Sequence, residues 1–423
     1  MDKSFLPLIM LIALIVHSPA WDMDSGAYGS LFDNLSEIFG IDSNAGLTAF
    51  PVLNVPMGGR SEGMAGAFAA VSDDISFLEW NPAGSSMLPY TELAFFHNNW
   101  IADTKVEGAA FASRYKDLGF AAGGKWLYTP FTEYNLYGER VSKGYYSEAV
   151  GILNASYNFF SGYYFSGVSA GLNLKGAFRF IPDFSNELGQ AAAGSGKEQS
   201  AAMVMGDLGV LTRFNLLKAY YSRDRNASAA LVLRNLGPPA LGDPLPATAS
   251  IALAYRPIRP ILISADLSAP LNLLEIGLSE SPYAAFGLSA AVTSFLSMRA
   301  GFLAKAGGVR LALGSAVSLN RVALDINYTL DLMTQFTPLN RISLGVRFNL
   351  GDQGRKARSD QVDELYLSGL QAYAEKQYTQ AKTQWEEALR LNPRFDPARE
   401  GLENLQYAQD VEKRIKDMEL LDF

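Results

Sequence analysis

Residue types that support catalysis are scarce in this chain. Of its 423 residues none is cysteine and two are histidines, His17 and His97. Without thiols the chain has no cysteine nucleophile, no thiolate zinc site and no disulfide, and two histidines do not make a multi-histidine metal site. A Ser-His-Asp arrangement would have to use His97, because His17 lies in a segment expected to be removed. We therefore expect no enzyme activity, no metal and no cofactor.

Several cations could instead hold a ligand. Lys175, Arg179 and Arg213 lie on the polar face of segments in which apolar and polar residues alternate. A cation beside an apolar slot could pair with the carboxylate of an amphipathic molecule. The alternative is a structural charge paired with Asp207, Asp266 or Asp325. The same two readings apply to Arg299, Arg310 and Arg347.

The segments that must position these cations have a period of two residues over 89–350. In the last of them Ile342, Leu344 and Val346 share one face, while Arg341 and Ser343 share the other. Such alternation is typical of a strand whose two faces meet different phases. After residues 1–20, no stretch of the sequence has the length and apolar character of a membrane-spanning helix. We interpret the region as β-structure.

A soluble sandwich would also alternate, but the segments favour a transmembrane barrel. They run for about 9–11 residues, the length that a tilted strand needs to cross hydrocarbon, whereas strands of globular proteins average about 5–6. Trp126 and Tyr128 lie at a strand end, where an aromatic girdle is expected. About fourteen such segments can be counted, and an even number is the rule for bacterial single-chain barrels. The prediction is an all-β transmembrane barrel of about 14 antiparallel strands over residues 89–350.

The connections between the segments give an orientation. Short turns such as Lys116-Asp117 alternate with long intervals, and this asymmetry is typical of periplasmic turns and outer loops. Both ends of the barrel then lie on the periplasmic side. The long intervals are residues 128–147, 181–199, 236–246, 269–281 and 331–340.

The beginning of the chain predicts export. Residues 1–20 combine Lys3, an apolar run and the small-residue ending Ser18-Pro19-Ala20, as a signal peptide does. The formal charge is −8, which argues against a nucleic-acid partner. Charge is also uneven, because 11 Lys/Arg and 15 Asp/Glu fall in the last 73 residues. We expect an outer-membrane protein of a diderm bacterium with a more soluble C-terminal domain.

Residues 45–88 are rich in glycine and do not alternate. The run Gly63-Met64-Ala65-Gly66-Ala67-Phe68-Ala69-Ala70-Val71-Ser72-Asp73-Asp74, followed by Trp80-Asn81-Pro82-Ala83-Gly84, resembles the long-chain fatty-acid transporter (FadL) family and its spirochaetal relatives. The resemblance implies that residues 21–88 are an N-terminal segment with a hatch that plugs the barrel. It implies that Asn81, Pro82, Ala83 and Gly84 hold the hatch against the wall, although Asn-Pro alone is a common turn initiator. A similar opening also occurs in outer-membrane proteins like the shuttle of a surface-protein secretion system.

The resemblance further implies a lateral exit for the ligand in the third strand. Here Gly123-Gly124 interrupts that strand, and a glycine pair weakens a strand ladder and permits a bulge. The alternative is that the glycines make room for a neighbouring side chain.

After residue 350 the pattern becomes helical. Residues 351–359 read as a polar linker, and 360–423 as a periplasmic helical domain. Its small and aromatic positions have the spacing of one tetratricopeptide repeat, in which small residues let two helices approach around a tryptophan. These positions are Gly369, Ala372, Tyr378, Ala381, Trp385, Ala388 and Pro393.

Together these features predict an outer-membrane transporter for hydrophobic molecules. The expected cargo is a long-chain fatty acid or another hydrophobic small molecule, moving passively past the hatch, in contact with outer-membrane lipid. The repeat domain would recruit a periplasmic protein. The alternative is an outer-membrane scaffold or shuttle-like protein that uses barrel and repeat for protein interactions.

Overall fold

The structure is a computed structural model of the whole chain. It describes residues 42, 44–100, 103–135, 137–182, 199–306, 308–332 and 339–419. The expected signal peptide, residues 1–20, lies outside the described residues.

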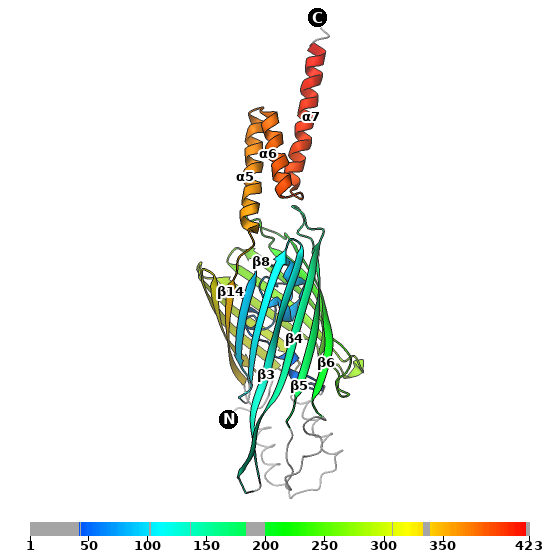
Figure 1. Cartoon of the computed structure of the whole chain (residues 1–423), viewed down its shortest axis with the longest axis vertical. Coiled ribbons are helices and arrows are strands. Elements are labelled where there is room, and N and C mark those ends of the chain that lie inside the picture. Colours follow the sequence, from blue (N-terminus) through cyan, green and yellow to red (C-terminus); the bar gives the residue numbers. More distant parts are fainter. Residues whose placement is uncertain are drawn as a thin grey trace, which may run out of the picture.

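In the described residues, fourteen antiparallel strands close into a barrel, as the sequence predicts (Figure 1). Each strand pairs with its neighbours in the chain, and β1 closes the ring against β14 with Glu92 opposite Asn349. The strands are β1 Glu92–Asn99, β2 Lys105–Tyr115, β3 Leu118–Tyr134, β4 Arg140–Phe159, β5 Val168–Phe180, β6 Ala201–Phe214, β7 Ala227–Leu236, β8 Ala247–Ile258, β9 Ile261–Leu271, β10 Tyr283–Ala291, β11 Leu296–Lys305, β12 Gly308–Leu319, β13 Val322–Asp331 and β14 Leu339–Asn349.

The two faces of the barrel wall have opposite chemistry. On β14, Ile342 and Leu344 are 50% and 45% exposed on the outside, whereas Arg341 and Ser343 are buried inside. Exposed aromatic side chains lie near both ends of the wall, with Trp126 and Tyr145 at one end and Tyr157 at the other. An apolar outer band between aromatic belts is the surface of a transmembrane barrel. Among the described helices, none is both long enough and apolar enough to cross a membrane.

The two ends of the barrel differ in their connections. We call the end that carries the C-terminal helices the helix-proximal end and the other the distal end. Longer connections gather distally and include the 3-10 helix η4 Ile276–Leu278. The expectation of a long loop at residues 128–147 is wrong, because β3 continues to Tyr134 and β4 starts at Arg140. Strands β3 and β4 stay paired over this interval, so their hairpin extends beyond the ends of the adjacent strands (Figure 1).

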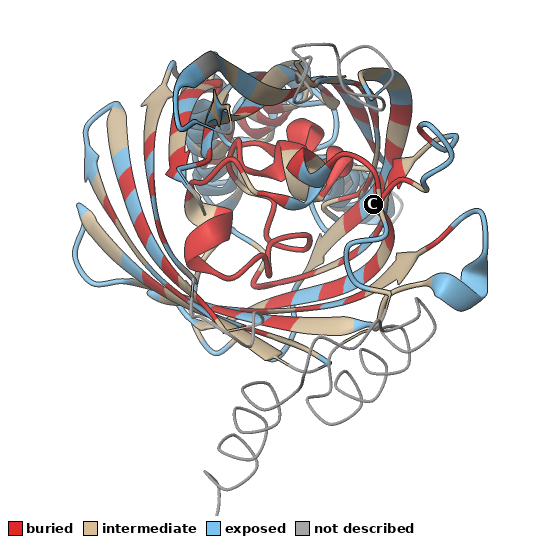
Figure 2. Cartoon of the chain, turned by 90° about the horizontal axis from the view of Figure 1, so that it is seen from below, coloured by how far each residue is buried: buried red, intermediate tan, exposed pale blue. Residues whose placement is uncertain are grey.

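Residues 44–88, here called the lumenal segment, lie inside the barrel. Figure 2, which looks along the barrel from the distal end, shows these buried residues within the ring of strands. Phe50, Phe68 and Phe77 are fully buried there. Because the segment lacks alternation, it forms short elements that bury side chains on all sides. These elements are η1 Pro51–Asn54, α3 Arg60–Gly63, α4 Phe77–Trp80 and η2 Pro82–Met87.

Glycines of the wall let the lumenal backbone approach the strands. A Cβ on Gly171 would lie 2.2 Å from the Pro82 carbonyl oxygen, and a Cβ on Gly209 2.2 Å from Asn81 Oδ1. On the opposite wall a Cβ on Gly301 would lie 2.3 Å from the backbone of Ala65. Contacts this short exclude a side chain, so the inner surface of the barrel is shaped to receive the segment.

Three helices follow the barrel: α5 Arg355–Ala374, α6 Tyr378–Leu391 and α7 Asp396–Glu419. The first begins at Arg355, so the linker is shorter than the expected 351–359. Asp352 accepts hydrogen bonds from the backbone N–H of Lys356 at 2.8 Å and of Gly354 at 3.0 Å. These bonds hold the pKa of Asp352 below its usual value, and the bond from Lys356 has the largest effect.

The core of the helical domain forms around Trp385. This side chain is 1% exposed, and its Nε1 donates to the Tyr366 carbonyl oxygen at 3.2 Å. A Cβ on Gly369 would lie 2.3 Å from Trp385 Nε1, so only glycine admits the indole there. Ala372, Ala381 and Ala388 are buried in the same core, Tyr378 is partly buried beside it, and Pro393 lies in the turn before α7.

The helical domain rests on the helix-proximal end of the barrel. Arg394 forms an ion pair with Asp117 at 2.6 Å, and the Tyr164 hydroxyl donates to Glu400 at 2.9 Å. Arg223 pairs with Asp363 of α5. The domain therefore contacts the turns of the barrel through polar side chains, and α7 extends away from it (Figure 1).

Candidate functional site

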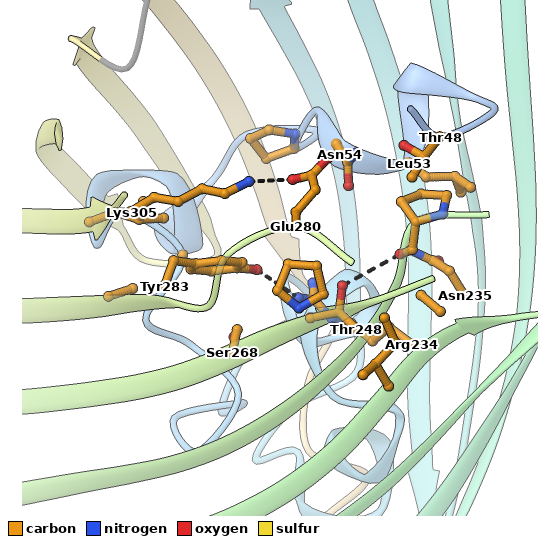
Figure 3. A pocket seen from close by; sticks show the side chains of 18 of the residues that line it. Thr48, Leu53, Asn54, Arg234, Asn235, Thr248, Ser268, Glu280, Tyr283 and Lys305 are labelled. Carbon is orange, nitrogen blue, oxygen red and sulfur yellow. Dashed lines mark hydrogen bonds and ion pairs between the residues drawn. The ribbon is translucent and has the colours of Figure 1, made fainter. Parts of the chain in front are cut away.

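A cavity of about 270 Å³ opens between the lumenal segment and the wall near the distal end. Strands β7 to β12 supply one side of this distal cavity and the lumenal segment supplies the other (Figure 3). Its apolar lining comes from Leu47, Leu53, Leu271, Leu278 and Leu303. Such a lining with a few polar groups is typical of a small-molecule site.

Most charges around the distal cavity are already neutralised. Lys305 pairs with Glu280, and Arg341 pairs with Glu62 of α3 at 2.8 Å. Arg310 pairs with Asp331 at 2.7 Å. Within the described part of the chain, the cation of this lining that no carboxylate pairs with is Arg234 of β7.

Arg234 is held by weak contacts. Its guanidinium carbon lies 4.9 Å from the centre of the Trp80 ring, and its Nη2 lies 3.4 Å from the Tyr283 hydroxyl. Three buried atoms of the lining have no hydrogen-bond partner among the described residues: Arg234 Nε, Trp80 Nε1 and Asp266 Oδ1. Buried polar atoms are nearly always satisfied, so a group of unsatisfied ones at a cavity indicates a place for a polar ligand atom or water.

Residues 65–71, here called the barrier loop, separate the distal cavity from a second cavity. Ala65 lines the distal cavity, whereas Val71 lines a cavity of about 500 Å³ toward the helix-proximal end. Asp266 Oδ2 accepts from the backbone N–H of Phe68 at 3.1 Å and of Ala69 at 2.9 Å. Ser264 donates to the Ala67 carbonyl oxygen at 2.7 Å. Polar groups of β9 thus hold the loop across the lumen.

The expected hatch motif lies next to this loop. Asn81 Nδ2 donates to the Ala69 carbonyl oxygen at 2.8 Å, and Asn81 Oδ1 accepts from the Ala83 N–H at 3.0 Å. Asn154 of β4 donates to the Pro82 carbonyl oxygen at 2.8 Å. A Cβ on Gly84 would lie 2.6 Å from Phe77, so this position needs glycine. The motif joins the barrier loop to strands β4 to β6.

Three ion pairs connect the rest of the lumenal segment to the wall. Arg347 pairs with Asp74 at 2.5 Å, and Lys125 pairs with Glu79 at 2.6 Å. The Arg341–Glu62 pair is the third. Breaking a buried pair leaves an uncompensated charge and costs about 3–5 kcal/mol, so these contacts restrict where the segment can sit.

The three cations singled out from the sequence do not converge on one site. Lys175 is buried and pairs with Asp207 at 2.7 Å, as the structural alternative supposed. Arg179 lies over the Phe50 ring at 5.4 Å. Arg213 donates to the carbonyl oxygens of Met87 and Ser72 at 3.3 and 3.2 Å. Lys175, Arg179 and Arg213 do not line the distal cavity.

Gly123 and Gly124 lie within an unbroken ladder. Strand β3 keeps one register with β2 and with β4 through both glycines. A Cβ on Gly123 would lie 2.8 Å from Leu78 of the lumenal segment. In this structure Gly123 therefore makes room for a neighbouring side chain.

Sequence reasoning missed Arg234, Trp80 and Tyr283 as neighbours in one site. The alternation of β7 does place Arg234 opposite the outward Leu231 and Leu233, so parity could have identified it as inward-facing. Nothing local indicates that Trp80, 154 positions earlier, covers it.

A protein-family model described as "Uncharacterised protein family (UPF0164)" matches residues 40–353. A UPF0164 protein of Treponema pallidum (strain Nichols) is 30% identical over 388 residues, which cover 87% of this chain and 85% of the relative. A second UPF0164 protein of that organism is 26% identical over 396 residues, covering 87% and 78%.

Two solved structures align with this chain at low similarity. The TodX monoaromatic hydrocarbon channel aligns with a TM-score of 0.40 and 13% identity, over 66% of this chain and 94% of that one. The KdgM porin aligns with a TM-score of 0.29 and 6% identity, over 61% and 99%.

Proposed function

We propose that this protein, which belongs to the UPF0164 family, is an outer-membrane barrel that admits small hydrophobic molecules bearing a negative end group. The cargo class that we favour is the long-chain fatty acid. Passage is passive, and no catalytic step is involved. The helical domain faces the periplasm, because the barrel end that carries it has the shorter turns.

The observation that carries this proposal is the distal cavity with its unpaired arginine. Its leucine lining suits an acyl chain, and Arg234 provides a guanidinium for the carboxylate. The other cations of the lining are engaged with Glu62, Glu280 and Asp331. Arg234 can therefore bind the negative group of a ligand without breaking an ion pair of the fold.

The volume of the distal cavity determines which part of the lumenal segment has to move to admit a long acyl chain. At about 270 Å³ the distal cavity lies just below the roughly 300–1,000 Å³ of most ligand sites. A long acyl chain therefore extends past the barrier loop toward the second cavity. We assign the barrier loop, rather than the whole lumenal segment, as the moving part, because three ion pairs and the close approach of Asn81 and Pro82 to Gly209 and Gly171 anchor the remainder.

Equilibrium binding of labelled oleate to the purified protein in uncharged detergent tests the proposal. Arg234→Gln should weaken oleate binding by about tenfold or more, since a charge-assisted hydrogen bond contributes about 1.5–3 kcal/mol. The matched control is Arg321→Gln, an exposed arginine in the turn between β12 and β13. Binding of hexadecanol, which lacks the charge, should be equal in both variants. Absence of saturable oleate binding to the wild type would refute the proposal.

The helical domain supports a second role, the recruitment of a periplasmic protein by its tetratricopeptide-like helices. Its last helix leaves Tyr407, Ile415 and Met418 exposed at 74%, 46% and 58%. Exposed apolar side chains on one helix are a feature of protein-binding surfaces. In the scaffold alternative, a protein that co-purifies with the full chain should be lost from Tyr407→Ser/Ile415→Ser, while oleate binding is unchanged.

A further inference from the structure

A second cavity system lies at the helix-proximal end, apart from the distal cavity. One part, of about 500 Å³, is lined by strands β2, β6, β8 and β9 and by the lumenal residues Val71, Asp73 and Met87. An adjoining part, of about 610 Å³, extends to α5 and to the turn before α7. The two parts share Arg114 and Arg225 in their linings. We call them together the vestibule.

Arginines dominate the charge of the vestibule. The inner part is lined by Arg114, Arg213, Arg223, Arg225 and Arg256. Of these, Arg223 pairs with Asp363. The other four form no ion pair with any carboxylate of the described residues.

The hydrogen bonds of these four arginines leave their charge uncompensated. Arg114 Nε donates to the Lys116 carbonyl oxygen at 2.7 Å, and Arg225 Nη2 donates to that of Tyr163 at 2.7 Å. Arg213 also donates only to carbonyl oxygens. No hydrogen bond or ion pair with a described residue is formed by the Arg256 guanidinium.

The acidic residues nearby do not balance this charge. Asp73 of the inner lining is bound by Arg60 at 2.6 Å, and Asp117 of the outer part is bound by Arg394. Asp224 is the remaining carboxylate of the inner lining. Four unpaired guanidiniums therefore face one unpaired carboxylate, and like charges held together in a partly dry space repel one another.

We propose that the vestibule binds a phosphate-bearing ligand. A single carboxylate would leave most of the excess charge in place, whereas a phosphate group brings about two negative charges and three acceptor oxygens. Guanidinium groups recognise phosphate by paired hydrogen bonds. The phosphate could belong to a soluble compound or to a lipid headgroup, and Val71, Met87 and Leu262 beside the arginines give an acyl chain apolar contacts.

Isothermal titration of the full-length protein in dodecyl maltoside with sodium pyrophosphate and, separately, dodecyl phosphate tests this inference. We expect saturable binding, weakened about tenfold or more by Arg256→Gln, a substitution that breaks no hydrogen bond or ion pair of the guanidinium with a described residue. Arg321→Gln, at the same end but outside the vestibule, should bind as the wild type does. Arg114→Gln replaces Arg256→Gln if the latter fails to fold.

The two probes distinguish the source of the phosphate. Tighter binding of dodecyl phosphate identifies a lipid, and equal binding identifies a soluble phosphate compound. If neither probe binds saturably, or if Arg321→Gln weakens binding as much as Arg256→Gln, the inference is wrong. Arg234→Gln lies in the distal cavity and should leave pyrophosphate binding unchanged, so loss of the oleate site and loss of the phosphate site are distinguishable.

Discussion

At the scale of single residues, the wall glycines determine how closely the lumenal segment docks. Gly171 and Gly209 lie on the adjacent strands β5 and β6, and their missing side chains are replaced by Pro82 and Asn81. Arg234 is a large inward-facing side chain instead, and its guanidinium lies over the Trp80 ring and pairs with no carboxylate of the described residues.

Gly171→Val should therefore destabilise the protein by about 1–3 kcal/mol or more, because the new side chain overlaps the Pro82 carbonyl group. The matched control is Gly151→Val on β4, where a Cβ meets nothing within 4 Å and the stability should change by at most about 0.5 kcal/mol. Urea unfolding of both variants in lipid vesicles measures the difference. Equal stabilities would show that the docking is looser than these contacts indicate.

At the scale of elements, the barrier loop and β9 form one unit. The carboxylate of Asp266 accepts two backbone N–H bonds from Phe68 and Ala69, and Ser228 of β7 donates to the Ala70 carbonyl oxygen at 2.6 Å. The loop has no regular secondary structure of its own to satisfy these groups. Its position therefore depends on side chains of the wall.

Asp266→Ala should open the lumen, since the loop loses the two hydrogen bonds that its backbone N–H groups donate to this side chain. We expect oleate uptake into proteoliposomes and ion conductance in planar bilayers to rise about tenfold or more. Asp243→Ala, in an exposed turn between β7 and β8, is the control and should behave as the wild type. A folded Asp266→Ala barrel with unchanged conductance would exclude the barrier loop as the gate.

At the scale of the whole molecule, three environments meet along one axis. The wall presents an apolar band outward, the lumen holds paired charges and a largely apolar cavity, and the helical domain exposes many charged and polar residues. The vestibule lies where the lumen and the helical domain meet. A ligand held there would contact both parts, because Arg223 and Arg394 bridge them at the same place.

The apolar band can be tested with one pair of variants on β12. Leu313 and Leu319 are 60% and 59% exposed, but Leu313 is at the middle of the strand and Leu319 at its end. Leu313→Arg should cost about 2–4 kcal/mol in a bilayer, and Leu319→Arg about 0–1 kcal/mol. Urea titration in vesicles measures both. Equal penalties would contradict a membrane centred on the strand midpoints.

The order, number and facing of the strands could be read from the chain, because alternation is a local property of adjacent residues. The C-terminal helices and the absence of cysteine chemistry could also be read from the chain. Which inward charges stay free was decided only by the tertiary structure. Arg341 finds Glu62 across 279 positions and Lys175 finds Asp207, whereas Arg234 meets an indole. Pairings across such distances depend on how the lumenal segment folds inside the closed barrel, and no periodicity encodes that.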